Sequence, residues 1–249
     1  LVLGLRLPRA AAGFAVGGLL ALAGALLQVL LRNPLADPWV LGVSGGGALG
    51  AVLAMWVGAS AALVTGAAWI GAAVSTLLLF ALGAGGANRG PAHGVVAPLR
   101  ILLAGVMLAS GWGALLTLVL SIAPDARLRG MLFWLIGDLA GASAWLAPGI
   151  ALAVGLLVAM RLAPSLNLML LGDARAFSLG VDVTRLRLAT CLLAALAAAF
   201  AVTTAGAVGF VGLIVPHTLR LVLGNDQRAL LPACVLAGGA LVVLADTLA

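Results

Sequence analysis

Residues 206–220, with the sequence GAVGFVGLIVPHTLR, set the architecture of this chain. They belong largely to an uncharged run of 32 residues, 188–219, which is too long for one membrane-spanning helix and too short for two. We therefore expect one full helix that ends near Ala205, followed by an interruption and a short second helix. The residues assigned to this broken-helix segment are Gly206, Gly209, Gly212, Pro216 and His217.

The composition indicates that the whole chain is built for a membrane. Of its 249 residues, 64% are hydrophobic and 8% are charged, and the mean hydropathy is +1.27. A soluble domain carries about 25% charged residues. The alternation typical of β-barrel strands does not occur in the sequence, so the backbone must satisfy its own hydrogen bonds as helices. The predicted fold is all-α, a polytopic transmembrane helical bundle that forms a single domain over residues 1–249.

Charge-free runs long enough to cross a bilayer give the remaining spans. The uncharged run from 38 to 88 is long enough for two helices, which we expect to reverse near 58–61, where Gly and Ser favour a turn. The other expected spans are 10–31, 101–124, 139–160 and 229–249. Glycines at four-residue spacing are expected to let helix backbones approach closely, as at Gly13 and Gly17 and at Gly46 and Gly50.

The orientation follows from arginine alone, because all 13 basic residues are Arg and all seven acidic residues are Asp. Alternating spans place nine arginines on one side: Arg32, Arg89, Arg100, Arg161, Arg175, Arg185, Arg187, Arg220 and Arg228. The other side receives Arg6, Arg9, Arg127 and Arg129. The positive-inside rule puts the larger set in the cytoplasm. The net charge of +6 is therefore a signal of topology, and no nucleic-acid partner is predicted.

Few residues of the chain could carry catalysis. Cys191 and Cys234 fall inside predicted spans without metal-ligand spacing, so neither a disulfide nor a metal site is expected. An intramembrane enzyme would need His217 and Asp246 to converge with a third polar group, and we expect Asp246 to be a helix-end residue with a local partner instead. The sequence holds no G-x-x-x-x-G-K-[ST] motif and no Lys, so we predict no ATPase site and no enzyme activity of its own.

Two cytoplasmic segments have more structure than a simple connection needs. Residues 32–44 contain two prolines that cannot continue a helix and lead directly into a new helix start. Residues 161–187 are the longest polar interruption, with four Arg and two Asp interleaved with apolar side chains. That pattern favours a short amphipathic helix pair on the membrane surface, which we interpret as a docking element for a partner. A passive channel, the other interpretation of a bundle with few internal charges, leaves this segment unexplained.

Six sequence blocks resemble one known family. They are RLPR (6–9), NPLADPWVLGVSGG (33–46), ILLAGV (101–106), LGDARAFSLGV (171–181), GFVGLIVPHTLRL (209–221) and LLPACVLAGGALVVLAD (230–246). Their order and spacing are similar to those of FecCD-type permeases, the membrane subunits of ATP-binding-cassette (ABC) importers for iron-siderophores, haem and cobalamin. The resemblance implies about ten helices, of which this chain would hold about eight and lack the first and last. It also implies a multi-pass protein of the bacterial inner membrane.

The resemblance further implies partners and roles for particular residues. The partners would be a second permease subunit in a homo- or heterodimer, cytoplasmic subunits that bind the ATP, and an extracytoplasmic substrate-binding protein that meets Arg6 and Arg9. The cytoplasmic gate would be formed by Asn33, Pro34, Leu35 and Ala36. Within the coupling segment 161–187, the ATPase would contact Leu171, Gly172, Asp173, Arg175, Phe177, Leu179 and Gly180.

This chain departs from the family at two places. Some members carry small hydroxyl residues at a second gate element, where this chain has Pro98 and Leu99, and members often carry Arg where this chain has Phe177. The expected cargo is a ferric siderophore, with haem second and cobalamin third. No cofactor is expected beyond the ATP bound by the partner subunit.

Overall fold

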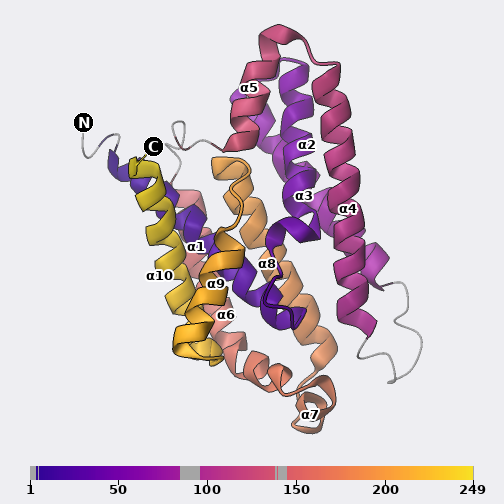
Figure 1. The fold of residues 1–249 in the computed structure, drawn as a ribbon, viewed down its shortest axis with the longest axis vertical. Coiled ribbons are helices and arrows are strands. Elements are labelled where there is room, and N and C mark those ends of the chain that lie inside the picture. The colour runs from indigo at the N-terminus through magenta and orange to yellow at the C-terminus, as the bar shows by residue number, and fades with distance from the viewer. Residues whose placement is uncertain (1–3, 5, 85–95, 138, 140–144, 249) are drawn as a thin grey trace.

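The computed structural model of the chain is a bundle of helices, and it describes residues 4, 6–84, 96–137, 139 and 145–248 (Figure 1). The helices of the first half are α1 (Leu7–Leu30), the 3-10 helix η2 (Pro38–Leu41), α2 (Val43–Trp56), α3 (Ala61–Ala84), α4 (Val96–Ser121) and α5 (Asp125–Ile136). Those of the second half are α6 (Leu146–Leu170), α7 (Asp173–Ser178), α8 (Val183–Ala205), α9 (Val211–Leu223) and α10 (Gln227–Leu248). The described residues form no strand, so the all-α prediction is confirmed.

Six of the described helices are long and apolar enough to cross a membrane, namely α1, α3, α4, α6, α8 and α10. The apolar helices α2 and α9 are shorter, with 14 and 13 residues. The reversal predicted near 58–61 is confirmed, because α2 ends at Trp56 and α3 begins at Ala61. Helix α8 ends at Ala205, as the glycine pattern predicted.

Two helices in the third quarter of the chain differ from the prediction. Helix α5 was not expected, since Asp125, Arg127 and Arg129 interrupt its apolar character and it is too short to read as a span. Helix α6 was expected over 139–160 and instead runs from Leu146 to Leu170. It continues past an arginine because a long charged side chain can lie along the helix while its head reaches the interface.

Helix α1 is the centre of the bundle, and most of its side chains are buried against α6, α8, α9 and α10. Two of its glycines touch backbone rather than side chains. A Cβ atom at Gly17 would lie 2.1 Å from the carbonyl oxygen of Gly238, and one at Gly24 would lie 1.8 Å from that of Gly212. Helices α10 and α9 therefore cross α1 at backbone contact, which only glycine permits.

The same kind of contact joins α2 to α3. A Cβ atom at Gly46 would lie 2.5 Å from the carbonyl oxygen of Gly71, and one at Gly50 would lie 2.1 Å from that of Ala67. The glycines predicted from four-residue spacing thus do bring backbones together at Gly17, Gly46 and Gly50. An edge-to-face contact between Trp69 and Phe200, with ring centroids 4.5 Å apart, then attaches α3 to α8.

The interruption after α8 is shorter than predicted. Residues 206–210 are not helical, whereas Gly212, Pro216 and His217 lie inside α9. At 1.5 Å per residue α8 is roughly 34 Å long and α9 roughly 20 Å. The five residues 206–210, when fully extended, span at most about 16 Å, which is enough to cover the difference in length between α8 and α9. The chain therefore turns back from the end of α8 toward the middle of the bundle before α9 begins.

The segment between α1 and α2 is built in the same way, as irregular backbone that leads into a short helix. Helix α2 is roughly 21 Å long, and the chain reaches its start through the loop 31–37 and η2. The two irregular segments meet, because Trp39 Nε1 of η2 donates a hydrogen bond to the carbonyl oxygen of Val208 at 3.4 Å. Irregular backbone at membrane depth must find such partners inside the protein.

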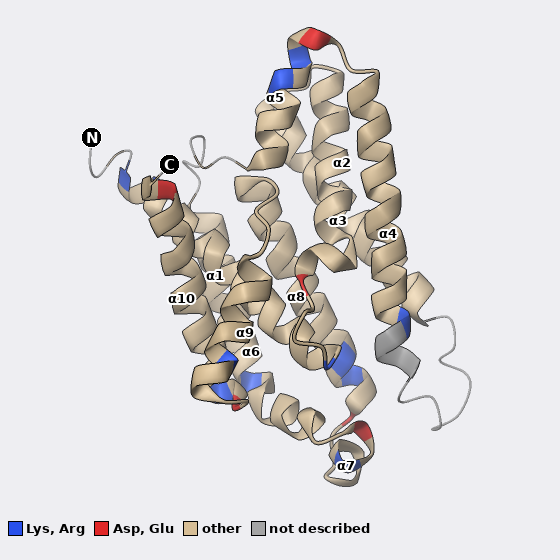
Figure 2. Cartoon of the chain, viewed as in Figure 1, with Lys and Arg blue, Asp and Glu red and all other residues tan. Residues whose placement is uncertain are grey.

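Charged residues gather toward the two ends of the bundle (Figure 2). One end carries the charges around α7 and the adjoining ends of α6 and α9, and the other carries those of α5 and the N-terminal turn of α1. This separation agrees with the alternating topology inferred from arginine counts. Arg89 was part of that count and lies outside the described residues.

Replacement of Gly24 by alanine tests the backbone contact between α1 and α9. We expect Gly24→Ala to destabilise the protein by about 1–3 kcal/mol or more, because the new methyl group has no space beside Gly212. The matched control is Gly66→Ala in α3, where an added Cβ meets nothing within 4 Å. Thermal unfolding in detergent measures both variants, and equal melting temperatures would contradict this account of the crossing.

Candidate functional site

The loop Asn33–Ala36 forms a tight turn directly after α1. Arg32 precedes it with a φ of 48°, in the left-handed region. Asn33 Oδ1 accepts a hydrogen bond from the Leu35 amide at 3.0 Å, and the Ala36 amide donates to the Asn33 carbonyl at 3.1 Å. Pro34 adds stiffness to the turn. The loop therefore presents Leu35, whose side chain is 67% exposed, while Ala36 is buried.

The C-terminal side of this loop is anchored in the bundle. Asp37 Oδ1 accepts from the Trp39 amide at 2.7 Å and caps η2. The Gly42 carbonyl accepts a hydrogen bond from Ser75 Oγ at 2.8 Å, and Ser75 Oγ in turn accepts from Trp112 Nε1 at 2.9 Å. This chain of bonds fixes η2 and the start of α2 to α3 and α4.

The N-terminal side of the loop is held by charges. Arg32 Nη2 donates to Asp173 Oδ1 and, at 3.1 Å, to the carbonyl of Met169. Arg187 Nη2 donates to the other carboxylate oxygen of Asp173. One carboxylate thus joins the end of α1, the start of α7 and the first turns of α8. From the sequence, Arg32 and Arg187 are expected on the cytoplasmic side without any pairing to Asp173. The position of all three residues in or beside the two unusual segments is the signal that could have indicated the pairing.

The predicted coupling segment contains one short helix rather than a pair. Residues 161–170 continue α6, and α7 covers Asp173–Ser178, after Gly172 with a φ of 112°. The apolar side chains expected to face a partner are exposed, at 54% for Leu171, 75% for Phe177 and 59% for Leu179. Gly180 follows α7 by two residues and has a φ of 85°, and Arg175 lies in the last turn of α7. An exposed apolar group on a segment outside the spanning helices is typical of a docking surface.

A second polar tie connects α6 to the turn between α9 and α10. Asn167 Nδ2 donates to Asp226 Oδ1 at 2.7 Å, and the Gln227 amide donates to Asn167 Oδ1 at 2.9 Å. The hydrogen bond from Asn167 holds the pKa of Asp226 below its usual range, and the bond from the Arg228 amide acts in the same direction. This carboxylate closes the turn between α9 and α10, where it accepts hydrogen bonds from Asn167 and from the Arg228 amide.

The two arginines predicted for the outer rim have different environments. Arg9 forms a two-bond ion pair with Asp246, with Nε–Oδ2 and Nη2–Oδ1 distances of 2.8 Å. Arg6 is exposed. The prediction that Asp246 has a local partner is confirmed. Since Asp246 lies roughly 28 Å along α10 from the turn that follows α9, and His217 lies in α9 near that turn, these two residues do not converge to form an active site.

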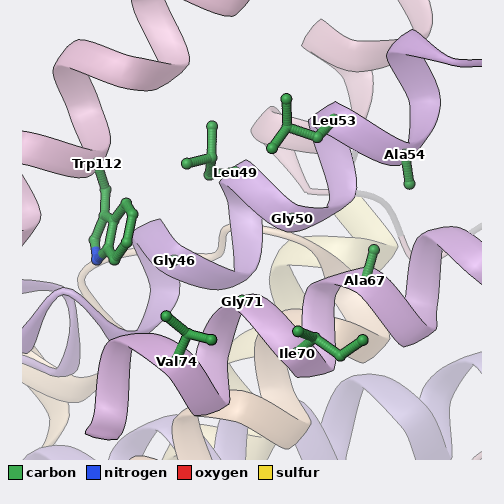
Figure 3. Close-up of a pocket in the computed structure, with 10 residues that line it drawn as sticks. All are labelled: Gly46, Leu49, Gly50, Leu53, Ala54, Ala67, Ile70, Gly71, Val74 and Trp112. Atoms are coloured by element: carbon green, nitrogen blue, oxygen red, sulfur yellow. The ribbon is translucent and has the colours of Figure 1, made fainter. Parts of the chain in front are cut away.

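The clearest cavity is apolar and lies between α2, α3 and α4 (Figure 3). Its volume is about 460 Å³. Trp112 lies at one end, Leu49 and Leu53 of α2 and Ile70 and Val74 of α3 line it, and the glycine contacts between α2 and α3 adjoin it. None of its lining residues is charged, and the described residues include no group of three or more His, Cys, Asp or Glu that could hold a metal ion. The cavity offers shape and apolar contact rather than chemistry.

The second predicted gate element lies at the start of α4. Pro98 and Leu99 belong to this helix, and their side chains lie outside the described residues. Cys191 and Cys234 are both buried, in α8 and α10.

Comparison with known proteins covers the whole chain. The sequence model of the FecCD transport family matches residues 1–249. The cobalamin import system permease protein BtuC of Halobacterium salinarum is 41% identical over 249 residues, which are 98% of this chain and 65% of that protein. The hemin transport system permease protein HmuU of Yersinia pestis and the Fe(3+) dicitrate transport system permease protein FecC of Escherichia coli are each 38% identical. They match 99% and 100% of this chain and 74% of their own lengths.

A solved structure also matches throughout. It is described as a metal-chelate type ABC transporter in an inward-facing conformation, and it superposes with a TM-score of 0.89 at 30% identity over 100% of this chain and 79% of that chain. This chain spans about two thirds to three quarters of the length of the curated relatives reported above.

Proposed function

This chain belongs to the FecCD transport family, and we propose that it is the transmembrane permease subunit of a binding-protein-dependent ABC importer. It would give alternating access to a path between two permease subunits, powered by ATP hydrolysis in cytoplasmic partner subunits. The observation that carries the proposal is α7, which lies outside the spanning helices and leaves Leu171, Phe177 and Leu179 exposed. An ATPase that covers these side chains would gain apolar burial worth about 25 cal/mol per Å².

The gate in this proposal is the loop Asn33–Ala36. Its turn is stiff, and it presents an exposed leucine at the cytoplasmic end of α1. Two such leucines facing each other across a subunit interface would close a path by excluding water. The second permease subunit, identical or different, is part of the proposal for this reason.

The proposed cargo is a bulky metal chelate delivered by an extracytoplasmic binding protein. The family resemblance led us to expect a ferric siderophore, and the relative named for Fe(3+) dicitrate supports that choice. Relatives named for cobalamin and hemin support the two alternatives from the same family. An apolar cavity without charged groups fits a division of labour in which the binding protein selects the chelate. A protein of this kind would lie in the cytoplasmic membrane of its cell, surrounded by lipid.

Substitution of Phe177 tests the ATPase docking surface. We expect Phe177→Asp to abolish co-purification of the ATPase subunit and ATP-driven uptake, because a carboxylate would be desolvated in the contact. Phe177→Leu is the matched control and should retain both. Uptake into proteoliposomes that contain the full complex is measured with a ferric siderophore, haemin and cyanocobalamin. Normal assembly and uptake with Phe177→Asp would rule out this docking site, and uptake without ATP would rule out the importer.

The gate prediction concerns Leu35. A cysteine introduced as Leu35→Cys in both permease subunits should form a crosslink between them in one nucleotide state and much less in another, and the crosslink should stop uptake. Val57→Cys is the control, since Val57 is equally exposed but lies at the α2–α3 turn. The native thiols are buried and should not react. If Leu35→Cys never crosslinks in any nucleotide state, the gate lies elsewhere, with the start of α4 as the next place to test.

The outer-rim prediction separates Arg6 from Arg9. We expect Arg6→Glu to slow association with the binding protein, because the free charge of Arg6 can steer an acidic patch. Arg9→Gln should have a smaller effect, since Asp246 already offsets the charge of Arg9. The effect of Arg6→Glu should shrink as salt rises above about 0.1 M, where the screening length is about 10 Å.

Stopped-flow association rates measure this effect, with Arg185→Glu at the opposite end of the bundle as a control for net charge. An association rate that Arg6→Glu leaves unchanged at every salt concentration would remove Arg6 from the docking surface.

A further inference from the structure

Asp173 occupies an unusual position, because its single carboxylate joins α7 and α8 to Arg32, which lies 141 residues away in sequence. Its Oδ1 accepts from Arg32, which precedes the loop Asn33–Ala36, and its Oδ2 accepts from Arg187 of α8. The side chains are partly to mostly buried, with exposures of 38% for Arg32, 17% for Asp173 and 13% for Arg187. Charge-assisted hydrogen bonds of this kind are stronger than those between neutral groups.

The connection runs directly into the proposed gate. Arg32 is the residue before Asn33, and Asn33 in turn fixes Leu35 through its side-chain oxygen. Asp173 is also the first residue of α7, the helix with the exposed docking side chains. Leu35 lies three residues after Arg32, and Phe177 lies four residues after Asp173. A single ion pair, between Arg32 and Asp173, therefore connects the docking surface to the gate residue.

The ion pairs of Asp173 resist any separation of α7 from Arg32. Both Arg32 and Arg187 contact the Asp173 carboxylate, so withdrawal of Asp173 would remove a charge-assisted hydrogen bond from each guanidinium group in a partly buried site. Loss of such a bond is costly because charge-assisted hydrogen bonds are stronger than neutral ones. A displacement of α7 must therefore carry Arg32 with it or pay that cost. The nearby pair Arg185–Asp182 is local and exposed, and it makes no such connection.

We propose that Asp173 is a positioning residue that couples the docking helix α7 to the gate loop through Arg32. When a bound ATPase subunit moves α7, the bond to Arg32 transmits the displacement to Asn33–Ala36 and so to Leu35. Arg187 of α8 holds the Asp173 carboxylate in place through its own hydrogen bond. This inference rests on the proposed function and deepens it by naming the residue through which the ATPase acts on the gate.

The test measures cargo taken up per ATP hydrolysed by the complete importer in proteoliposomes. We expect Asp173→Asn to lower this ratio about tenfold, as expected for the loss of one charge-assisted hydrogen bond. ATPase binding and hydrolysis are expected to stay unchanged for Arg32→Gln, because Arg32 lies outside the predicted ATPase contacts. Asp173→Glu should restore most of the ratio. Arg32→Gln should lower it as Asp173→Asn does, whereas Arg187→Gln should lower it less. If the cluster had only a structural role, Arg187→Gln should lower the ratio more than Arg32→Gln does, because Arg187 is the more buried arginine.

Two controls keep the outcomes distinct. Asp226→Asn removes a carboxylate that also ties a cytoplasmic turn to α6 but not to the gate loop, and its uptake per ATP should equal that of the wild type. Spin labels on Leu35→Cys and on Ala174→Cys, an exposed position of α7 outside the predicted ATPase contacts, should keep a constant separation through the ATP cycle with Asp173 present and a variable one with Asp173→Asn. A wild-type complex without ATP-driven uptake would defeat the proposed function itself. Wild-type uptake together with normal ratios for Asp173→Asn and Arg32→Gln would defeat the coupling alone.

If Asp173→Asn fails to assemble, Arg32→Gln decides the question, because it leaves the bond between Asp173 and Arg187 in place. A normal ratio for Arg32→Gln in an assembled complex then overturns the proposal, and a ratio lowered about tenfold supports it.

Discussion

The fold depends on one constraint, which is that irregular backbone placed between membrane-spanning helices must find hydrogen-bond partners within the protein. Two such segments, the loop with η2 and residues 206–210, precede the two short helices α2 and α9. Part of this need is met by the hydrogen bond from Trp39 Nε1 to the Val208 carbonyl, which joins the two segments. Close packing makes this meeting possible, because Gly24 brings the backbones of α1 and α9 into contact beneath it.

The same constraint gives the loop Asn33–Ala36, the proposed gate, two unlike ends. Its C-terminal end continues into η2, where Asp37, Ser75 and Trp112 fix the backbone by hydrogen bonds within the bundle. Its N-terminal end is held by the ion pair between Arg32 and Asp173, at the end of the bundle that carries α7. A loop fixed at one end and attached to a surface helix at the other is suited to move as that helix moves. The asymmetry explains why a small displacement of α7 could reposition Leu35 without disturbing the packing around α1.

The sequence predicted what depends on apolar length and missed what depends on contact. The spans α1, α3, α4, α8 and α10 and the end of α8 at Ala205 followed from hydropathy and glycine positions, because lipid imposes both. Helix α5 and the continuation of α6 past Arg161 were missed, since charged residues hid them in a count of apolar runs. The cluster around Asp173 could not be derived from spacing, because Arg32 lies 141 residues away and only the fold brings the two together.

Most charged residues of the protein lie toward the two ends of the bundle. The clearest cavity is apolar, and buried Asp37 accepts the Trp39 amide hydrogen bond that begins η2. At one end Arg9 is paired with Asp246 while Arg6 is exposed, and at the other end Asp173 joins Arg32, beside the loop Asn33–Ala36, to α7. A bundle with few charges in its interior has little of its own to drive a cargo in one direction. In the proposed importer, direction comes from partners that bind these two ends in sequence. Substitutions at the proposed contacts with these partners should therefore change transport without changing the fold.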